Sequence, residues 1–202
     1  MIAIIDYGVG NLFSLVCSFK SIGVEAVVTN RIEEIEAADK LILPGVGAFG
    51  DARRKLAEAG MDRVILEQAQ KGKPILGICL GMQLLFEWGN EYGVHPGLGL
   101  LPGEVVSMEG VLPAQYKIPH IGWNQLIFKK ESPLFRYIQD GDYVYFVHSY
   151  FVKGCESSLL AITEYGAELT AAVAKDNIYG CQFHPEKSGG VGLDILRGFA
   201  EL

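Results

Sequence analysis

The chain has little of several patterns that mark specialised proteins. Its 202 residues include only 8 prolines, and no stretch approaches the ~20 consecutive apolar residues that a membrane-spanning helix requires. It has 4 cysteines and no C-x-x-C pair, so neither a disulfide framework nor a zinc knuckle is indicated: Cys17, Cys79, Cys155 and Cys181. With 17 basic against 24 acidic residues, the net charge of -7 argues against nucleic acid or an anionic membrane as the main partner.

Two further motifs are missing. The N-terminus has no basic leader and runs straight into a short apolar segment, so we expect a cytoplasmic protein without a secretory signal. No G-x-x-x-x-G-K-[ST] loop is present, so ATP chemistry within this chain is not expected.

What the chain does contain is a regular alternation of short β-branched segments and longer helical periods in its first half. This rhythm predicts crossover units on a mostly parallel sheet, with strands at 2–5, 25–28, 40–43 and 74–78 and helices at 11–22 and 61–71. From residue 104 the pattern becomes β-rich, with expected strands at 105–106, 125–128, 143–152, 159–163, 171–174 and 178–183, then a helix at 191–202. We therefore predict one α/β domain over residues 1–202, in three layers, with helices on both faces of the sheet and antiparallel strands added to it.

The segment from Pro74 to Phe86 has the layout of a nucleophile elbow, in which a strand turns sharply into a helix at a reactive residue. Gly77 and Gly81 stand two residues to either side of Cys79, where the missing Cβ allows close packing. The first amides of the helix favour the thiolate and can meet a developing oxyanion. The helix is expected to turn Leu84, Leu85 and Trp88 inward. A buried structural cysteine is the alternative interpretation.

A thiolate nucleophile needs a proton shuttle, and the chain offers His95, His120, His148 and His184. We favour His184, because Pro185 favours extended backbone and Glu186 then lies on the same side as the imidazole. This predicts a relay of Cys79, His184 and Glu186. A surface histidine beside a carboxylate is the alternative, whereas zinc at Cys181 and His184 lacks a second pair of ligands.

The spacing Gly45-x-Gly47-x-x-Gly50 imitates a dinucleotide fingerprint. It does not fit one, because the next strand ends at Cys79 and supplies no acidic residue for a ribose. The peptide around Val46 can instead reorient and aim an N–H outward. Together with the N–H of Leu80, it would form an oxyanion hole.

Two motifs together resemble the class I (triad) glutamine amidotransferases: Gly77-Ile-Cys-Leu-Gly-Met-Gln-Leu-Leu85 and Phe183-His-Pro-Glu186. Five further motifs resemble one branch of that family, the glutaminase subunits of imidazole glycerol phosphate synthases: Asp6-Tyr-Gly-x-Gly-Asn-Leu12, Pro44-Gly-Val-Gly-Ala-Phe49, Pro119-His-Ile-Gly-Trp-Asn124, Tyr145-Phe-Val-His-Ser-Tyr150 and His184-Pro-Glu-Lys-Ser188. The glutaminase of pyridoxal phosphate synthase is the competing branch, but its Gly-Gly-Glu-Ser segment is absent. Segments 89–99 and 107–116 match no motif.

The resemblance implies a flavodoxin-like amidotransferase fold that hydrolyses glutamine through a cysteinyl thioester, with no cofactor and no metal. It implies that Cys79 is the nucleophile, that His184 is the acid and base, and that Glu186 orients it. By the same resemblance, the substrate-binding residues are Gly47, Gln83, Ser149 and Tyr150, although from sequence alone the last three are ordinary helix and strand side chains.

The resemblance also implies a partner, a (β/α)8-barrel cyclase subunit that receives the ammonia for histidine biosynthesis. Trp123, Tyr145 and Lys187 would lie at or near this interface, whereas the sequence alone favours core positions for both aromatics. Because the peptide around Val46 can store an unproductive orientation, we expect the isolated chain to be nearly inactive. The alternatives are a stand-alone cysteine hydrolase of γ-glutamyl substrates and a flavodoxin-like binding module in which Cys79 is inert.

Overall fold

A computed structural model describes residues 1–202 and contains one large sheet at its centre. Its eight strands lie in the order β2 (Ala26–Thr29), β1 (Ile2–Ile5), β3 (Lys40–Leu43), β4 (Ile75–Ile78), β14 (Ile178–Cys181), β13 (Glu168–Lys175), β12 (Leu159–Glu164) and β9 (Ile127–Phe128). Neighbours from β2 to β14 are parallel, and the last three strands are added antiparallel.

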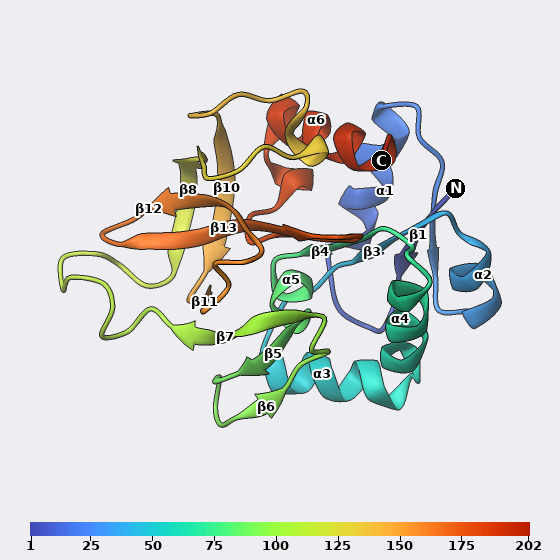
Figure 1. The fold of residues 1–202 in the computed structure, drawn as a ribbon, viewed down its shortest axis with the longest axis horizontal. Helices are drawn as coiled ribbons and strands as arrows, with labels where there is room; N and C mark the ends of the chain where they lie inside the picture. Colours follow the sequence, from blue (N-terminus) through green and yellow to red (C-terminus); the bar gives the residue numbers. More distant parts are fainter.

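Helices cover both faces of this sheet (Figure 1). One face carries α1 (Leu12–Ser21) and α6 (Gly189–Ala200), and the other carries α3 (Phe49–Glu58), α4 (Met61–Gln70) and α5 (Leu80–Leu84); α2 (Ile32–Ala37) packs on β1 and α4. Along β1, Ile2 and Ile4 belong to one buried cluster and Ala3 and Ile5 to the other. Successive side chains of a strand thus supply both cores, which explains the uninterrupted apolar sequence and confirms the predicted three-layer α/β fold.

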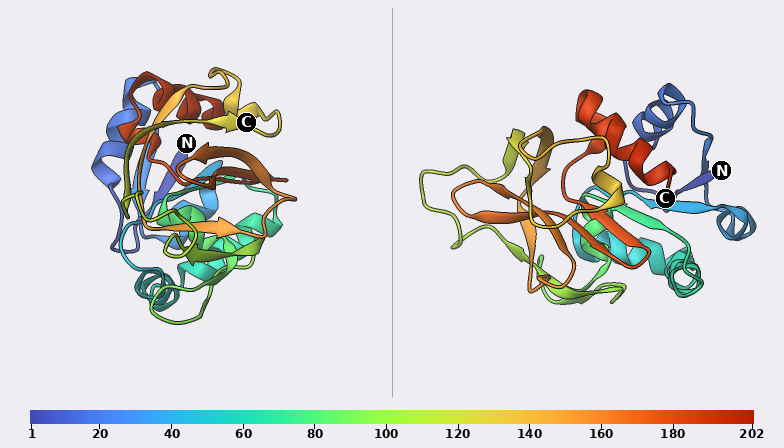
Figure 2. Two further views of the ribbon diagram at one scale, coloured as in Figure 1. Left: turned by 90° about the vertical axis from the view of Figure 1, so that its left-hand side faces the viewer. Right: turned by 45° about the horizontal axis from the view of Figure 1, so that its top comes forward.

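Two smaller sheets flank the central one (Figure 2). The first has the order β11 (Tyr150–Lys153), β7 (Leu101–Ser107), β5 (Phe86–Gly89) and β6 (His95–Pro96), and the second pairs β10 (Tyr143–His148) with β8 (His120–Gln125). Two short 3-10 helices complete the chain, η1 (Pro133–Phe135) and η2 (Pro185–Lys187). The prediction that the late strands join the central sheet is therefore wrong for β7, β10 and β11, and the sequence did not predict β5, β6 or most of β8 as strands.

Other expectations also need correction. Helices α2 and α3 were not predicted, because neither carries a long apolar stripe. The helix of the elbow has only five residues, and Trp88 lies beyond it on β5, where its side chain is 49% exposed instead of turned inward. The polypeptide leaves the helix at Phe86 to form a strand, which breaks the helical spacing that placed Trp88 inside.

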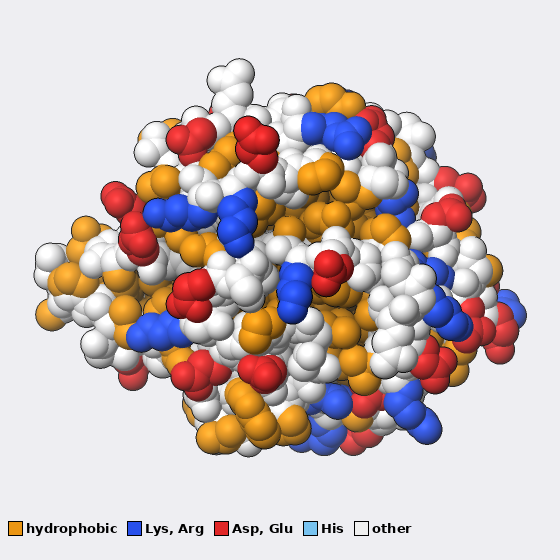
Figure 3. Space-filling model, in the orientation of Figure 1, with side chains coloured by type: hydrophobic (Ala, Val, Ile, Leu, Met, Phe, Trp, Pro, Cys, Tyr) orange, Lys and Arg blue, Asp and Glu red, His pale blue; other side chains and the backbone are white.

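The surface carries both signs of charge. In the view of Figure 3, acidic and basic side chains are interspersed and no broad basic patch is visible. No helix of the chain has both the length and the apolar character needed to cross a bilayer.

The turn from β4 into α5 is packed against β3 and the following residues so closely that only glycine fits at two positions. A Cβ at Gly81 would lie 1.8 Å from the carbonyl oxygen of Leu43, and one at Gly77 would lie 2.6 Å from the Cα of Met82. Both obstacles are backbone atoms, which cannot rotate aside. The two glycines of the elbow motif are therefore required by sterics.

We predict that Gly81→Ala lowers the free energy of unfolding by about 3 kcal/mol or more, because overpacking against fixed backbone forces the elbow open. The matched control is Gly190→Ala in α6, where a Cβ meets nothing within 4 Å, and which should be neutral or slightly stabilising. Urea denaturation of both variants measures the difference. Equal stabilities would contradict the steric account of the elbow.

Candidate active site

The neighbouring parallel strands β4 and β14 bring the two reactive segments together. Their register pairs Ile78 with Cys181, and the N–H of Cys79 donates to the carbonyl of Cys181 at 2.7 Å. Since parallel strands end at the same sheet edge, the residues that follow each strand meet there. Cys79 and His184 are therefore neighbours although 104 residues separate them along the chain.

Cys79 sits in a strained turn. Its backbone has φ 55° and ψ −113°, in a region that residues with a side chain seldom adopt. The residue is 8% exposed, and its sulfur lies 4.0 Å from the carbonyl oxygen of Val147 and 3.8 Å from Nε2 of Gln182. This geometry agrees with the predicted elbow, in which the thiol is held above the sheet edge.

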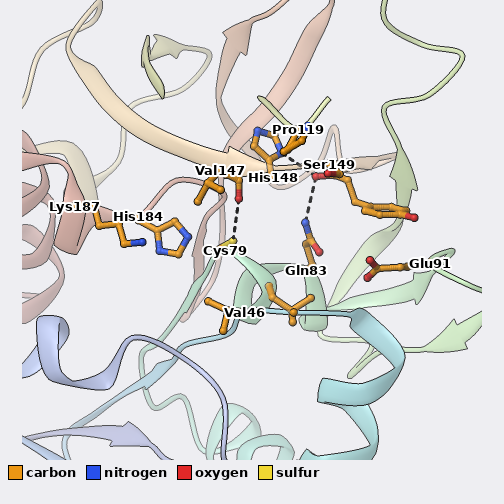
Figure 4. A pocket seen from close by; sticks show the side chains of 13 residues that line it. Val46, Cys79, Gln83, Glu91, Pro119, Val147, His148, Ser149, His184 and Lys187 are labelled. Atoms are coloured by element: carbon orange, nitrogen blue, oxygen red, sulfur yellow. Dashed lines mark hydrogen bonds between the residues drawn. The ribbon is translucent and has the colours of Figure 1, made fainter. Parts of the chain in front are cut away.

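His184 and Glu186 form a buried pair. Nδ1 of His184 lies 2.8 Å from Oε1 of Glu186, and both side chains are at most 3% exposed. Burial alone would lower the pKa of His184, but hydrogen bonding and charge interactions with Cys79 and Glu186 outweigh it and raise the pKa to about 10. Figure 4 shows the imidazole of His184 beside the sulfur of Cys79. The ring is therefore held ready to carry a proton at neutral pH.

The structure corrects the reason given for the contact between His184 and Glu186. His184 is extended, with φ −102° and ψ 98°, but Glu186 lies in the 3-10 helix η2 and not on a continuing strand. The carboxylate of Glu186 therefore reaches the ring of His184 because η2 turns the backbone, and not because the two residues alternate along a strand. The second carboxylate oxygen, Oε2, is buried without a hydrogen-bond partner.

The loop after β3 lies directly against the elbow. A Cβ at Gly45 would be 2.6 Å from the backbone nitrogen of Gly81, and Gly47 has φ +93°. The hydroxyl of Tyr7 donates to the carbonyl of Pro44 at 2.7 Å and anchors the start of the loop. The expected oxyanion-hole segments thus lie side by side. The loop also leads directly into α3, a helix that the sequence analysis had not placed there.

A cavity of about 410 Å³ opens over the sulfur (Figure 4). It gathers the predicted nucleophile, base, oxyanion and substrate-binding residues in one lining: Val46, Gly47, Cys79, Leu80, Gln83, Ser149, Tyr150 and His184. Within it, Nε2 of Gln83 donates to the carbonyl of Tyr150 at 3.3 Å and to Oε1 of Gln182 at 2.9 Å. Glu186 stands behind His184 and is not part of the lining.

Of the three predicted interface residues, Lys187 lines the cavity, and the two aromatics lie on the two-stranded sheet of β8 and β10. Tyr145 on β10 pairs with Trp123 on β8, and their rings lie 6.0 Å apart. Trp123 is 54% exposed, Tyr145 is half-buried, and the exposed Lys187 lines the cavity. The core positions that the sequence alone favoured for the two aromatics are wrong, because alternate residues of this two-stranded sheet face away from the core.

Several residues that build the site were not expected from the sequence: Tyr7, Glu91, Pro119, Val147 and Gln182. His148, which was weighed only as a candidate base, also lines the cavity. Most of them lie inside or directly beside the motifs already quoted, so proximity to those motifs was the available signal. Glu91 falls in segment 89–99, which matched no motif. Its carboxylate accepts the N–H of Phe49 at 2.7 Å and fastens this segment to the first turn of α3.

Comparison with known proteins now fixes the family. Residues 3–201 match the model of the glutamine amidotransferase class-I family. The chain belongs to this family. It is 53% identical over 203 residues to the imidazole glycerol phosphate synthase subunit HisH of Caldanaerobacter subterraneus, covering 100% of this chain and 98% of that protein. The HisH subunit of Methanothermobacter thermautotrophicus is 51% identical with the same coverage. These relatives confirm the branch that the motifs indicated.

Solved structures agree on the fold of this amidotransferase. One described as a glutamine amidotransferase superposes with a TM-score of 0.77 at 20% identity, covering 100% of this chain and 98% of that one. The structure of PurLQS from Thermotoga maritima gives 0.76 at 21% identity, covering 99% and 97%. At these identities, the likeness concerns the fold alone.

We predict that Glu186→Gln lowers the pKa of His184 by about 1 to 3 units from its raised value of about 10, because one of the two partners that oppose the effect of burial loses its charge while Cys79 remains. The ring would therefore lose its proton at a lower pH than in the wild-type protein. NMR titration of the imidazole measures the change, and the ring of His120, which does not contact Glu186, is the internal control. An unaltered His184 titration would contradict the assigned pairing.

Proposed function

We propose that this chain is the glutaminase subunit of an imidazole glycerol phosphate synthase, acting as one domain over residues 1–202. The observation that carries the proposal is the buried His184–Glu186 pair beside the sulfur of Cys79, in a cavity of about 410 Å³. The names and full-length coverage of the HisH relatives support the assignment to this synthase. The competing branch, pyridoxal phosphate synthase, has no specific observation in its favour.

In the proposed reaction, the sulfur of Cys79 attacks the carboxamide carbon of glutamine. Before the attack, the proton of the Cys79 thiol already resides on Nε2 of His184, because the raised pKa keeps the ring charged and Nδ1 is engaged by Glu186; His184 then gives this proton to the departing ammonia. The C–N bond breaks as a γ-glutamyl thioester forms. Water, deprotonated by His184, attacks the thioester and releases glutamate, and the thiol is regenerated.

The tetrahedral intermediates carry a negative oxygen that needs preorganised donors. The N–H of Leu80, in the first turn of α5, is one candidate. The loop at Val46 and Gly47 supplies the second, and the positive φ of Gly47 shows that this peptide already uses glycine's conformational range. A peptide flip there would switch the second donor on or off.

The substrate's amino-acid head group would occupy the end of the cavity away from His184. Gln83, Ser149 and Tyr150 line that end, and Gln83 uses its amide N–H groups within the protein, which leaves Oε1 to accept from the substrate ammonium. Fixed polar groups of this kind orient a small ligand.

The partner is proposed to be a (β/α)8-barrel cyclase subunit that forms a heterodimer with this chain in the cytoplasm and uses the ammonia for histidine biosynthesis. The exposed Trp123, which packs against the half-buried Tyr145, and Lys187 in the cavity lining are the proposed contacts with this partner. The backbone of Tyr145 also contacts the catalytic segment, because its carbonyl accepts the N–H of His184 at 3.0 Å. Four free cysteines are consistent with a reducing compartment.

We predict that the isolated chain hydrolyses glutamine very slowly and that the purified cyclase partner raises the rate by at least about 100-fold, since one oxyanion donor contributes about that much. Cys79→Ala should abolish glutamate release in the complex without changing its thermal unfolding. Glutamate release is measured with free glutamine and with γ-glutamyl peptides in competition. Full turnover without partner, or a preference for the peptides, would favour a stand-alone γ-glutamyl hydrolase.

We predict that Trp123→Ala weakens binding of the cyclase partner by about 2 kcal/mol or more, because a large exposed aromatic is lost at the proposed interface. Trp88→Ala is the matched control, since Trp88 is exposed to a similar extent (49% against 54%) on a different sheet. Calorimetric titration measures both affinities. Equal affinities for the two variants would rule out this interface.

A further inference from the structure

The carboxamide of Gln182 has no part in the reaction described above, yet it touches the nucleophile. Its Nε2 lies 3.8 Å from the sulfur of Cys79, within the range of an N–H···S hydrogen bond. The residue is fully buried at 0% exposure, and its backbone N–H donates to the carbonyl of Ala171 at 2.8 Å. The backbone of Gln182 is therefore held in place, and its side chain starts from a fixed position next to the thiol.

Neighbouring hydrogen bonds fix which end of this amide faces the sulfur. The carbonyl of Tyr150 can only accept, so the atom of Gln83 beside it at 3.3 Å must be the amide nitrogen. The same nitrogen lies 2.9 Å from the Gln182 carboxamide and must donate to an oxygen there. The remaining end of the Gln182 amide, which faces Cys79, is consequently its NH2 group.

On the other side of Tyr150, two histidines continue this series of hydrogen bonds, and their donors and acceptors are fixed as well. Nδ1 of His148 lies 2.8 Å from the carbonyl of Tyr150 and must carry a proton, which leaves Nε2 to accept from Nδ1 of His120 at 3.1 Å. Burial lowers the pKa of His148 to about 3 and that of His120 to about 4, so both rings stay neutral. Neither ring gains a second proton at neutral pH, so the donor and acceptor directions of these hydrogen bonds do not change.

We infer that Gln182 is a further catalytic residue of this site, whose amide N–H donates to the sulfur of Cys79 and stabilises the thiolate. The proton of the thiol is held on Nε2 of His184, the electron pair stays on sulfur, and the amide N–H of Gln182 stabilises the negative charge on sulfur. Hydrogen bonds to a charged acceptor are stronger than those to a neutral one. The inference deepens the proposed function and relies on it for the identity of the nucleophile.

The test compares two substitutions that remove the donor. Gln182→Met keeps approximate length and volume, whereas Gln182→Glu keeps the acceptor for Gln83 but points an oxygen at the sulfur. Gln68→Met and Gln68→Glu are the matched controls, because Gln68 is also buried but lies on α4 and does not contact Cys79. Thermal unfolding of all four variants monitors the fold.

The main readout is the rate at which iodoacetamide alkylates Cys79 between pH 5 and 10, followed by mass spectrometry of its peptide so that exposed Cys17 does not interfere. We expect the pH midpoint to rise by about 0.5 to 1 unit in Gln182→Met and further in Gln182→Glu, whose carboxylate repels the thiolate. In the complex, kcat for glutamine should fall about tenfold with KM changed much less. Both Gln68 variants should keep the wild-type midpoint.

Other groups that titrate near the sulfur are unchanged by these substitutions. His184 and Tyr7 interact with Cys79, Glu186 stands behind His184, and Glu91 and Lys187 line the cavity. A midpoint shift confined to the Gln182 variants therefore reports the lost donor. Wild-type midpoints and kcat in folded Gln182→Met and Gln182→Glu would overturn the inference.

Alkylation requires no glutamine turnover, which separates this inference from the proposed function. If the wild-type complex fails to hydrolyse glutamine while the midpoints still shift, the proposed substrate is wrong but the contact of Gln182 with the sulfur is upheld. If a Gln182 variant does not fold, the other variant decides the question.

Discussion

The parallel pairing of β4 with β14 is the constraint on which the site depends. It joins two strands that are far apart in the sequence and makes both end at one edge of the sheet. Cys79 follows one strand and the segment from Gln182 to Glu186 follows the other, so nucleophile, base and orienting carboxylate converge without any long-range loop. A shift of this register by one residue would point every side chain of a strand to the opposite face and separate the sulfur from the imidazole.

Close packing makes the elbow around Cys79 rigid, whereas the loop at Gly47 is less tightly packed. Backbone contacts at Gly77 and Gly81 leave the elbow no freedom, and Cys79 is held at a positive φ by its surroundings. The loop at Gly47 differs, because a Cβ there would meet nothing within 4 Å. The proposed oxyanion loop thus lies against a fixed nucleophile but retains room to reorient, as the proposed activation by a partner subunit requires.

The sequence predicted the parts whose physics is local. Strands β1 and β3 have the predicted bounds, because a run of four apolar residues in β1, and of three after Lys40 in β3, marks strands buried on both faces. The glycines flanking Cys79 revealed the elbow. Features that depend on distant parts of the chain were predicted less well. Trp88 was placed in the core because the helix was expected to be longer than it is. The two small sheets depend on strand pairings that no single segment encodes. The sequence did not single out Gln182 and offered His148 only as a candidate base, because both act in a hydrogen-bond network that only the folded structure assembles.

In the proposed reaction, Cys79 carries the γ-glutamyl group during turnover. The most direct measurement is acid quenching of the complex of this chain with its cyclase partner during glutamine hydrolysis, followed by mass spectrometry of the cysteine-containing peptides. The account predicts a mass increase of one γ-glutamyl group on the Cys79 peptide alone. Steady turnover with an adduct on another cysteine, or with none under conditions that preserve thioesters, would contradict it.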